Sequence, residues 1–108
     1  MEQILVIDRD PIHRSALTEA LGRYSRSTLA CVCLEEALSA IERQAFTLII
    51  VVAHARVDWY ADVDIIRHAA LRQLHPPQIV CLLRGPYRGP TEQVYAARRG
   101  FRVVYEQR

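Results

Sequence analysis

The 108-residue sequence contains no lysine, so arginine supplies all 14 of its basic side chains. This absence excludes a P-loop, which needs a lysine after its glycine-rich turn. Only four glycines are present, and the segment "DRDPIH" after the first apolar run has none, which argues against a dinucleotide-binding fingerprint. The net charge of +2 is too small to indicate direct contact with nucleic acid.

Long apolar runs are also missing, because none approaches the roughly 20 residues of a membrane-spanning helix. The N-terminus has no basic region and no cleavage site, so we expect a cytoplasmic protein without membrane contact. The three cysteines are an odd count, and Cys31 and Cys33 share a face of a predicted strand, poorly placed to bond each other. We expect these two and Cys81 to be buried thiols, and no spacing of cysteine and histidine indicates zinc or another cofactor.

Short apolar runs alternate with amphipathic stretches along the whole chain. The runs predict strands over 3–7, 27–32, 46–52, 76–83 and 101–107. Apolar residues at helical spacing predict helices within 10–24, 33–44, 62–75 and 91–99. This order predicts one α/β domain over residues 1–108, a doubly wound five-stranded parallel sheet whose last helix is missing or truncated.

The segment "ILVIDRDP" ends the first predicted strand in two acids around an arginine. In a parallel sheet, ligands bind outside the carboxyl ends of the strands, where this segment meets the loops after strands three and four. Asp8 and Asp10 suggest a cation site, while Arg9 carries the charge that a cation would bring. We favour a former metal site that a side chain now closes, with Asp10 as the helix N-cap before Pro11.

Four segments together resemble the receiver domain of bacterial two-component response regulators. They are "ILVIDRDPIHRSALTEALG", "EEAL", "FTLIIVV" and "ARRGFRVVYEQ", in the order that the family shows. The resemblance spans nearly the whole chain and implies a flavodoxin-like strand order 2-1-3-4-5. In active members, an aspartate that ends strand three accepts a phosphoryl group beside Mg²⁺.

The resemblance contradicts that chemistry at most of the positions that perform it. The phosphoryl acceptor falls on Val52, and the two acids that help the family hold Mg²⁺ fall on Asp8 and Arg9. The Ser/Thr and the Lys that contact the phosphoryl group fall on Leu82 and Gln107. The aromatic of strand five that switches rotamer falls on Val104, with Tyr105 beside it. The Ser/Thr position moves to Leu83 if the register slips by one residue. One of the six positions is retained, which implies a degenerate receiver pocket with no catalytic, cofactor-binding or metal-binding residue.

Other residues allow a functional or a structural interpretation. Asp58 or Asp62 could be a displaced acceptor, but we favour a solvated loop acid and a helix cap. We interpret His54 as a loop residue rather than a phosphoryl carrier, and "RGPYRGP" as turns rather than an anion site formed by Arg84 and Arg88. Trp59 and Tyr60 are equally compatible with an exposed contact pair and with packing over the third helix.

The preferred hypothesis is a pseudo-receiver: a phosphorylation-independent interaction, dimerisation and regulatory module of a signal-transduction or transcriptional regulator. The alternative is a functional receiver that phosphorylates itself on an unorthodox residue. We expect an output domain beyond Arg108 and other signalling proteins as partners. Because no fifth helix follows the last strand, we expect a homodimer through the uncovered face or near Tyr95, Val103, Val104 and Tyr105.

Overall fold

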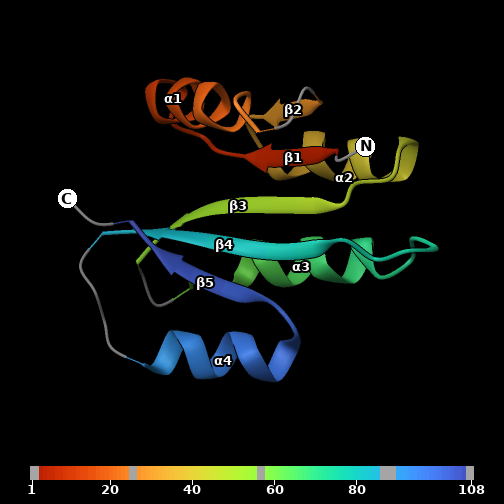
Figure 1. The fold of residues 1–108 in the computed structure, drawn as a ribbon. Coiled ribbons are helices and arrows are strands. Elements are labelled where there is room, and N and C mark those ends of the chain that lie inside the picture. The colour runs from red at the N-terminus through yellow and green to blue at the C-terminus, as the bar shows by residue number, and fades with distance from the viewer. Residues whose placement is uncertain (1–2, 25–26, 56–57, 86–89, 107–108) are drawn as a thin grey trace.

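The computed structural model describes residues 3–24, 27–55, 58–85 and 90–106 and contains the alternating elements that the sequence predicts. Figure 1 shows their arrangement. The strands are β1 (Ile4–Ile7), β2 (Thr28–Cys31), β3 (Leu48–His54), β4 (Gln78–Arg84) and β5 (Arg102–Tyr105). The helices are α1 (Pro11–Leu21), α2 (Leu34–Arg43), α3 (Ala61–Ala70) and α4 (Thr91–Arg99).

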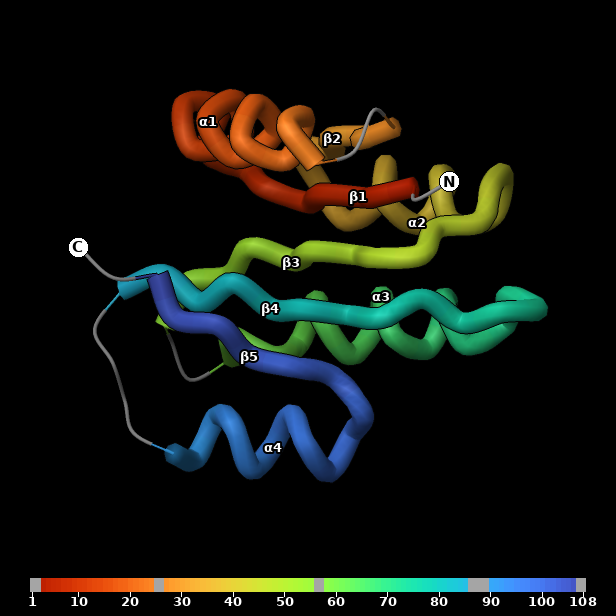
Figure 2. Tube along the Cα trace, viewed as in Figure 1, coloured from red at the N-terminus to blue at the C-terminus, as the bar shows by residue number. Residues whose placement is uncertain are grey.

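All neighbouring strands are parallel, in the order β2-β1-β3-β4-β5, which confirms the predicted topology (Figures 1 and 2). Ile7 pairs with Val51, so Asp8 and Val52 follow at the same level. Val52 pairs with Leu82, and Leu82 pairs with Val104. This register places Leu82, and not Leu83, beside the predicted acceptor position.

Two apolar clusters lie on opposite faces of the sheet because successive strand residues point to opposite sides. The larger cluster packs Leu5, Ile49 and Cys81 against α2, α3 and α4. The smaller one packs Ile4, Val6 and Ile50 against partly buried side chains of α1. Most of the folding free energy from apolar burial therefore comes from the face that carries three helices.

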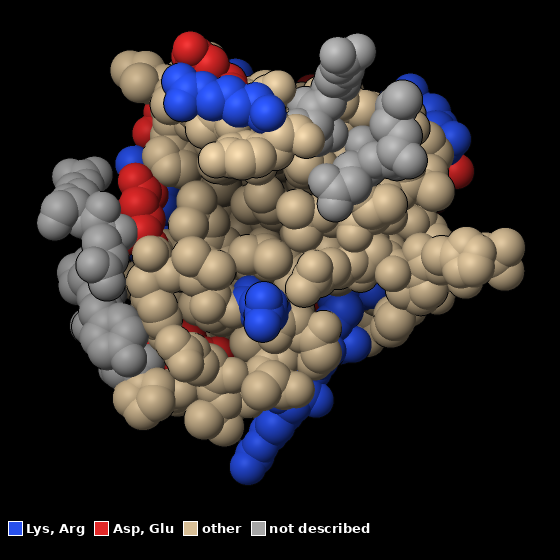
Figure 3. All heavy atoms as spheres, in the orientation of Figure 1, with Lys and Arg blue, Asp and Glu red and all other residues tan. Residues whose placement is uncertain are grey.

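The face that carries α1 is only partly covered. No residue of α1 is buried, and Ile12 on this helix is 82% exposed. Figure 1 shows β3, β4 and β5 in front of α3 with no helix before them, and in Figure 3 the same face is mostly uncharged. Val104 on β5 is 48% exposed there, although strand residues of a parallel sheet are normally buried on both faces.

The helix ends differ in part from the sequence expectation. Gly100 has φ +80° and ends α4 in the left-handed conformation that glycine adopts most easily. The N-cap of α3 is Tyr60, so Asp62 lies inside the first turn and does not cap the helix. That helix ends at Ala70, several residues before the predicted end.

The cysteines correct one sequence interpretation. Cys31 and Cys81 are buried, and burial raises the pKa of both thiols, that of Cys81 to about 12. Cys33 is only half-buried, because β2 ends at Cys31 and Cys33 takes the N-cap position of α2. In the part of the chain that the structure describes, no helix is long and apolar enough to cross a membrane.

Candidate functional site

The candidate site lies where β1, β4 and β5 end, at the carboxyl edge of the sheet. Asp8 follows β1, and its N–H donates to the carbonyl of Cys31 on β2 (3.0 Å). Arg84 is the last residue of β4, and Glu106 follows β5 with its N–H bonded to the carbonyl of Leu83 (3.0 Å). Backbone pairing therefore places two acids and an arginine from distant parts of the sequence at one edge.

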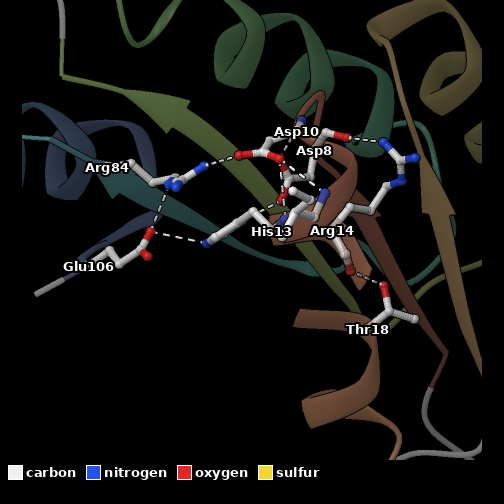
Figure 4. Close-up of polar contacts among 8 residues, drawn as sticks. Asp8, Asp10, His13, Arg14, Thr18, Arg84 and Glu106 are labelled. Atoms are coloured by element: carbon white, nitrogen blue, oxygen red, sulfur yellow. Dashed lines mark hydrogen bonds and ion pairs between the residues drawn. The ribbon is translucent and has the colours of Figure 1, made fainter. Parts of the chain in front are cut away.

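Asp8 is buried, with only 2% of the residue exposed, and both of its carboxylate oxygens have partners. Its Oδ2 lies 2.5 Å from Nδ1 of His13, in the first turns of α1 (Figure 4). Its Oδ1 accepts the backbone N–H of Asp10 at 3.1 Å. The carbonyl of the same residue accepts Nη1 of Arg14 at 2.9 Å. These bonds compensate the cost of burying a carboxylate.

His13 and Arg84 connect this buried acid to the other two acids of the edge. Nε2 of His13 lies 3.0 Å from Oε2 of Glu106, and Nε of Arg84 lies 2.9 Å from the same oxygen, both as ion-pair contacts. Nη1 of Arg84 donates to Oδ2 of Asp10 at 3.1 Å. We call these five residues, Asp8, Asp10, His13, Arg84 and Glu106, the carboxyl-edge network (Figure 4).

Asp10 has two structural tasks. Its Oδ1 accepts the N–H groups of Ile12 (3.0 Å) and His13 (3.3 Å), which makes it the N-cap of α1, as the sequence predicts. The hydrogen bond from Arg84 and the N–H of His13 lower the pKa of its carboxyl. The same bond to Asp10 raises the pKa of Arg84.

An Asp10→Asn variant should separate the charge of this residue from its capping role, since asparagine caps helices as well as aspartate does. The lowered pKa in the folded state means that the charge stabilises the fold fully above the ordinary value of 3.8 and stops doing so as the pH falls through the lowered value. The wild type should therefore have a higher free energy of unfolding than the variant at pH 7. Urea unfolding at pH 7, 5 and 3 measures this difference, which should shrink in acid; a difference that grows there would contradict the assignment.

Arg9 does not neutralise the acids on either side of it. Its side chain is 76% exposed, and its Nη2 lies 3.7 Å from Oδ2 of Asp62. The idea that Arg9 occupies the place of a metal between Asp8 and Asp10 is therefore wrong, because His13 faces the first acid and Arg84 the second.

The predicted acceptor position lies beside the network. Val52 and Leu82 are half-buried and pack against the smaller apolar cluster. Val52 also lines a 310 Å³ cavity between the end of β3 and the start of α3. The other residues that line this cavity include Arg9, His54, Asp58, Trp59 and Asp62. Gln107 and Arg88 lie outside the described residues.

Mg²⁺ does not fit these side chains as they are arranged. The metal prefers several oxygen ligands, but His13 and a backbone N–H already occupy the oxygens of Asp8. The guanidinium of Arg84 contacts Asp10 and would repel a divalent cation. Within the described ranges, no group of three or more His, Cys, Asp or Glu side chains is arranged to hold a metal ion.

The aromatic residues near α4 pack within the molecule. Trp59 and Tyr60 fold over the start of α3, with ring centroids 5.7 and 4.6 Å from that of Tyr95. The hydroxyl of Tyr95 donates to Asp64 at 2.7 Å, and the guanidinium carbon of Arg99 lies 3.6 Å from the Tyr95 ring centroid. Burial first, and then the bond to Asp64, raise the pKa of this tyrosine. The structure therefore favours packing for Trp59 and Tyr60.

The other residues of the expected interaction surface differ in exposure. Val103 is half-buried against the larger apolar cluster. The hydroxyl of Tyr105 donates to the buried Glu92 at 3.1 Å. Val104 points to the opposite face of the sheet and, unlike Val103 and Tyr105, is exposed.

Sequence reasoning missed the roles of His13, Arg84 and Glu106. Glu106 lies near the end of the predicted strand 101–107, and an acid at that end of a strand was an available signal. His13 had no such signal, because residues five apart do not face each other along a strand or a helix, and only the turn from β1 into α1 brings its ring to Asp8.

Strand order and parallel pairing give this chain a flavodoxin-like fold, which is the fold of receiver domains. NtrX from Brucella abortus, a response regulator whose crystal structure was determined in complex with ADP, has a similar structure, with a TM-score of 0.73 and 23% sequence identity. The similarity covers 100% of this chain and 23% of NtrX, so the chain spans about a quarter of that protein. No protein-family model matches the chain, and no curated protein matches it significantly.

Proposed function

We propose that the chain is a pseudo-receiver, a signalling module that regulates through protein contacts and does not depend on phosphorylation. The carboxyl-edge network supports this proposal most strongly. It engages the one retained acid, Asp8, with His13, and it joins the ends of β1, β4 and β5 through Arg84. Val52, at the acceptor position, has no nucleophilic atom.

The side chains of the carboxyl-edge network contact one another, whereas the corresponding side chains of a phosphorylated receiver would contact the phosphoryl group and the metal. Asp8 and Asp10 already have side-chain partners in His13 and Arg84, and Glu106 contacts both of these partners. A metal or a phosphoryl group would have to displace these contacts, and Arg84 beside Asp10 would repel a divalent cation. We therefore infer that this edge keeps a single conformation. Regulation would then depend on the abundance of the protein or of its partner.

Incubation with acetyl phosphate and Mg²⁺, followed by intact-mass measurement, tests the proposal. We expect no mass increase, while an active receiver treated in the same buffer gains one phosphoryl group. A gain that Asp58→Asn or Asp62→Asn abolishes would overturn the proposal. It would establish instead an unorthodox acceptor within the cavity beside Val52.

Dimerisation through the uncovered sheet face is the second part of the proposal. Val104 is 48% exposed on the edge strand β5, where it pairs with Leu82 of β4, and α1 covers only part of the same face. A second copy would remove this surface from water, and a two-fold arrangement would let the face pair with itself.

Val104→Asp should weaken such a dimer at least about tenfold, because a carboxylate would be buried without a partner. Val94→Asp is the matched control, since Val94 is 51% exposed but lies on α4. Light scattering across a dilution series measures the effect. A wild type that is monomeric at every concentration and binds no hydrophobic dye would contradict the dimer.

The wider context of the module is also a proposal. The similarity covers all of this chain but only 23% of the NtrX chain, which is therefore much longer. We propose that the module belongs to a larger cytoplasmic regulator whose output domain follows Arg108. Other signalling proteins would then be its partners, and a transcriptional output is one form that this regulator would take.

A further inference from the structure

A groove on the helical side lies between the last turn of α2 and the outer side of α3. Its volume is 670 Å³. Apolar side chains form its floor, among them Leu38, Ile41 and Ile65. Both helices end at the amino edge of the sheet, so the groove lies at the opposite end of the sheet from the carboxyl-edge network (Figure 1).

Gln73 holds the groove in shape. Its side-chain amide donates to the carbonyls of Ile41 (3.2 Å) and Gln44 (3.0 Å), and its Oε1 accepts the N–H of Phe46 (3.4 Å). These bonds satisfy the free carbonyls at the end of α2 and connect them to the segment after α3. The groove is therefore preformed, which lowers the entropy cost of binding.

The rim of the groove is positively charged. Arg43 and Arg72 are exposed, and neither forms an ion pair with a described residue, while Glu42 is the single acid of the lining. Arg43 lies in the last turn of α2, where a cation also offsets the helix dipole. The dipole effect accounts for Arg43. It does not account for Leu74, an apolar residue that lines the same groove and is 90% exposed.

We propose that this groove binds an acidic amphipathic helix of a partner protein. The apolar floor and Leu74 fit apolar residues at helical spacing, and the two arginines fit carboxylates beside them. A second copy of this chain fits poorly, since a two-fold contact here would bring both arginine pairs together. The proposal gives the regulatory module a specific partner and does not depend on the absence of phosphorylation.

The probe is a fluorescein-labelled peptide of about 15 residues, with leucine at positions i, i+3, i+4 and i+7 and glutamate on the flanks. Fluorescence anisotropy should show binding that weakens with salt. Arg43→Glu with Arg72→Glu should weaken it at least about tenfold, and Leu74→Ser should weaken it severalfold. Arg23→Glu with Arg98→Glu, the same charge change at exposed sites elsewhere, should change it less than about twofold.

A charge swap makes the test specific. A peptide with lysine in place of glutamate should bind the Arg43→Glu, Arg72→Glu variant and not the wild type. The backbone-amide NMR chemical shifts of the protein that change when the peptide binds should cluster on α2 and α3. Absence of binding, equal losses in both double variants, or equal binding of a sequence-scrambled peptide would overturn the proposal. Self-association that Arg43→Glu with Arg72→Glu abolishes would identify a second copy as the occupant and would also overturn it. The phosphodonor experiment is separate, so the two proposals fail independently.

Discussion

A triple variant, Arg9→Asp, His13→Leu and Val52→Asp, is expected to bind Mg²⁺ at least about tenfold more tightly than the Arg9→Asp, Val52→Asp double variant. The double variant adds two carboxylates near Asp8, but His13 still engages the Oδ2 atom of that acid at 2.5 Å. Removal of the imidazole frees this oxygen for a cation. Val52→Asp alone should bind Mg²⁺ no better than the wild type.

Crowded carboxylates should also make the triple variant less stable than the wild type when no metal is present, and Mg²⁺ should restore part of the loss. Calorimetric titration gives the affinities, and thermal unfolding with and without Mg²⁺ gives the stabilisation. Arg9→Asn, His13→Leu and Val52→Asn is the control, since it has similar shape without the added charges. If Val52→Asp alone bound Mg²⁺ as tightly as the triple variant, His13 would not be the obstacle.

Arg84→Met should lower the free energy of unfolding by about 2–3 kcal/mol, the largest stability effect that we expect at the carboxyl edge. The Arg84 side chain is only 14% exposed, and its guanidinium contacts both Asp10 and Glu106. Its loss leaves these acids with fewer cationic partners, although their partial exposure keeps the cost below that of a fully buried pair.

Arg9→Met is the matched control for this prediction. Arg9 lies at the same edge, but its 3.7 Å contact with Asp62 is on the surface, so its loss should cost less than about 1 kcal/mol. Urea unfolding at pH 7 measures both variants. Glu106→Gln combined with Arg84→Met should cost less than the sum of the single changes, because the two residues share a contact. Equal costs for Arg84→Met and Arg9→Met would show that the network does not stabilise the fold.

The two proposed contact surfaces lie on different sides of the molecule. The sheet face around Val104 is apolar and suits a second copy, whereas the α2–α3 groove has a basic rim and suits an acidic partner. Occupation of one surface leaves the other free. A dimer with two bound partner helices is therefore compatible with both proposals.

The sequence alone determined the fold and the chemical nature of residue 52. Apolar runs such as residues 46–52 alternate with amphipathic stretches, and this local pattern depends only on which residues are near in sequence. The same is true of Asp10 as a helix cap and of a valine at position 52, which no tertiary contact can turn into a nucleophile.

Only the tertiary structure decided which cations face which acids. Arg9 is next to Asp8 and Asp10 in sequence, which made it the natural partner, but its side chain is directed to solvent and Asp62. Arg84 reaches Asp10 from 74 residues away because β4 ends at the same edge as β1. Ion pairs depend on distance in space, and parallel strands bring remote residues together at one edge, so sequence neighbours were a poor guide there.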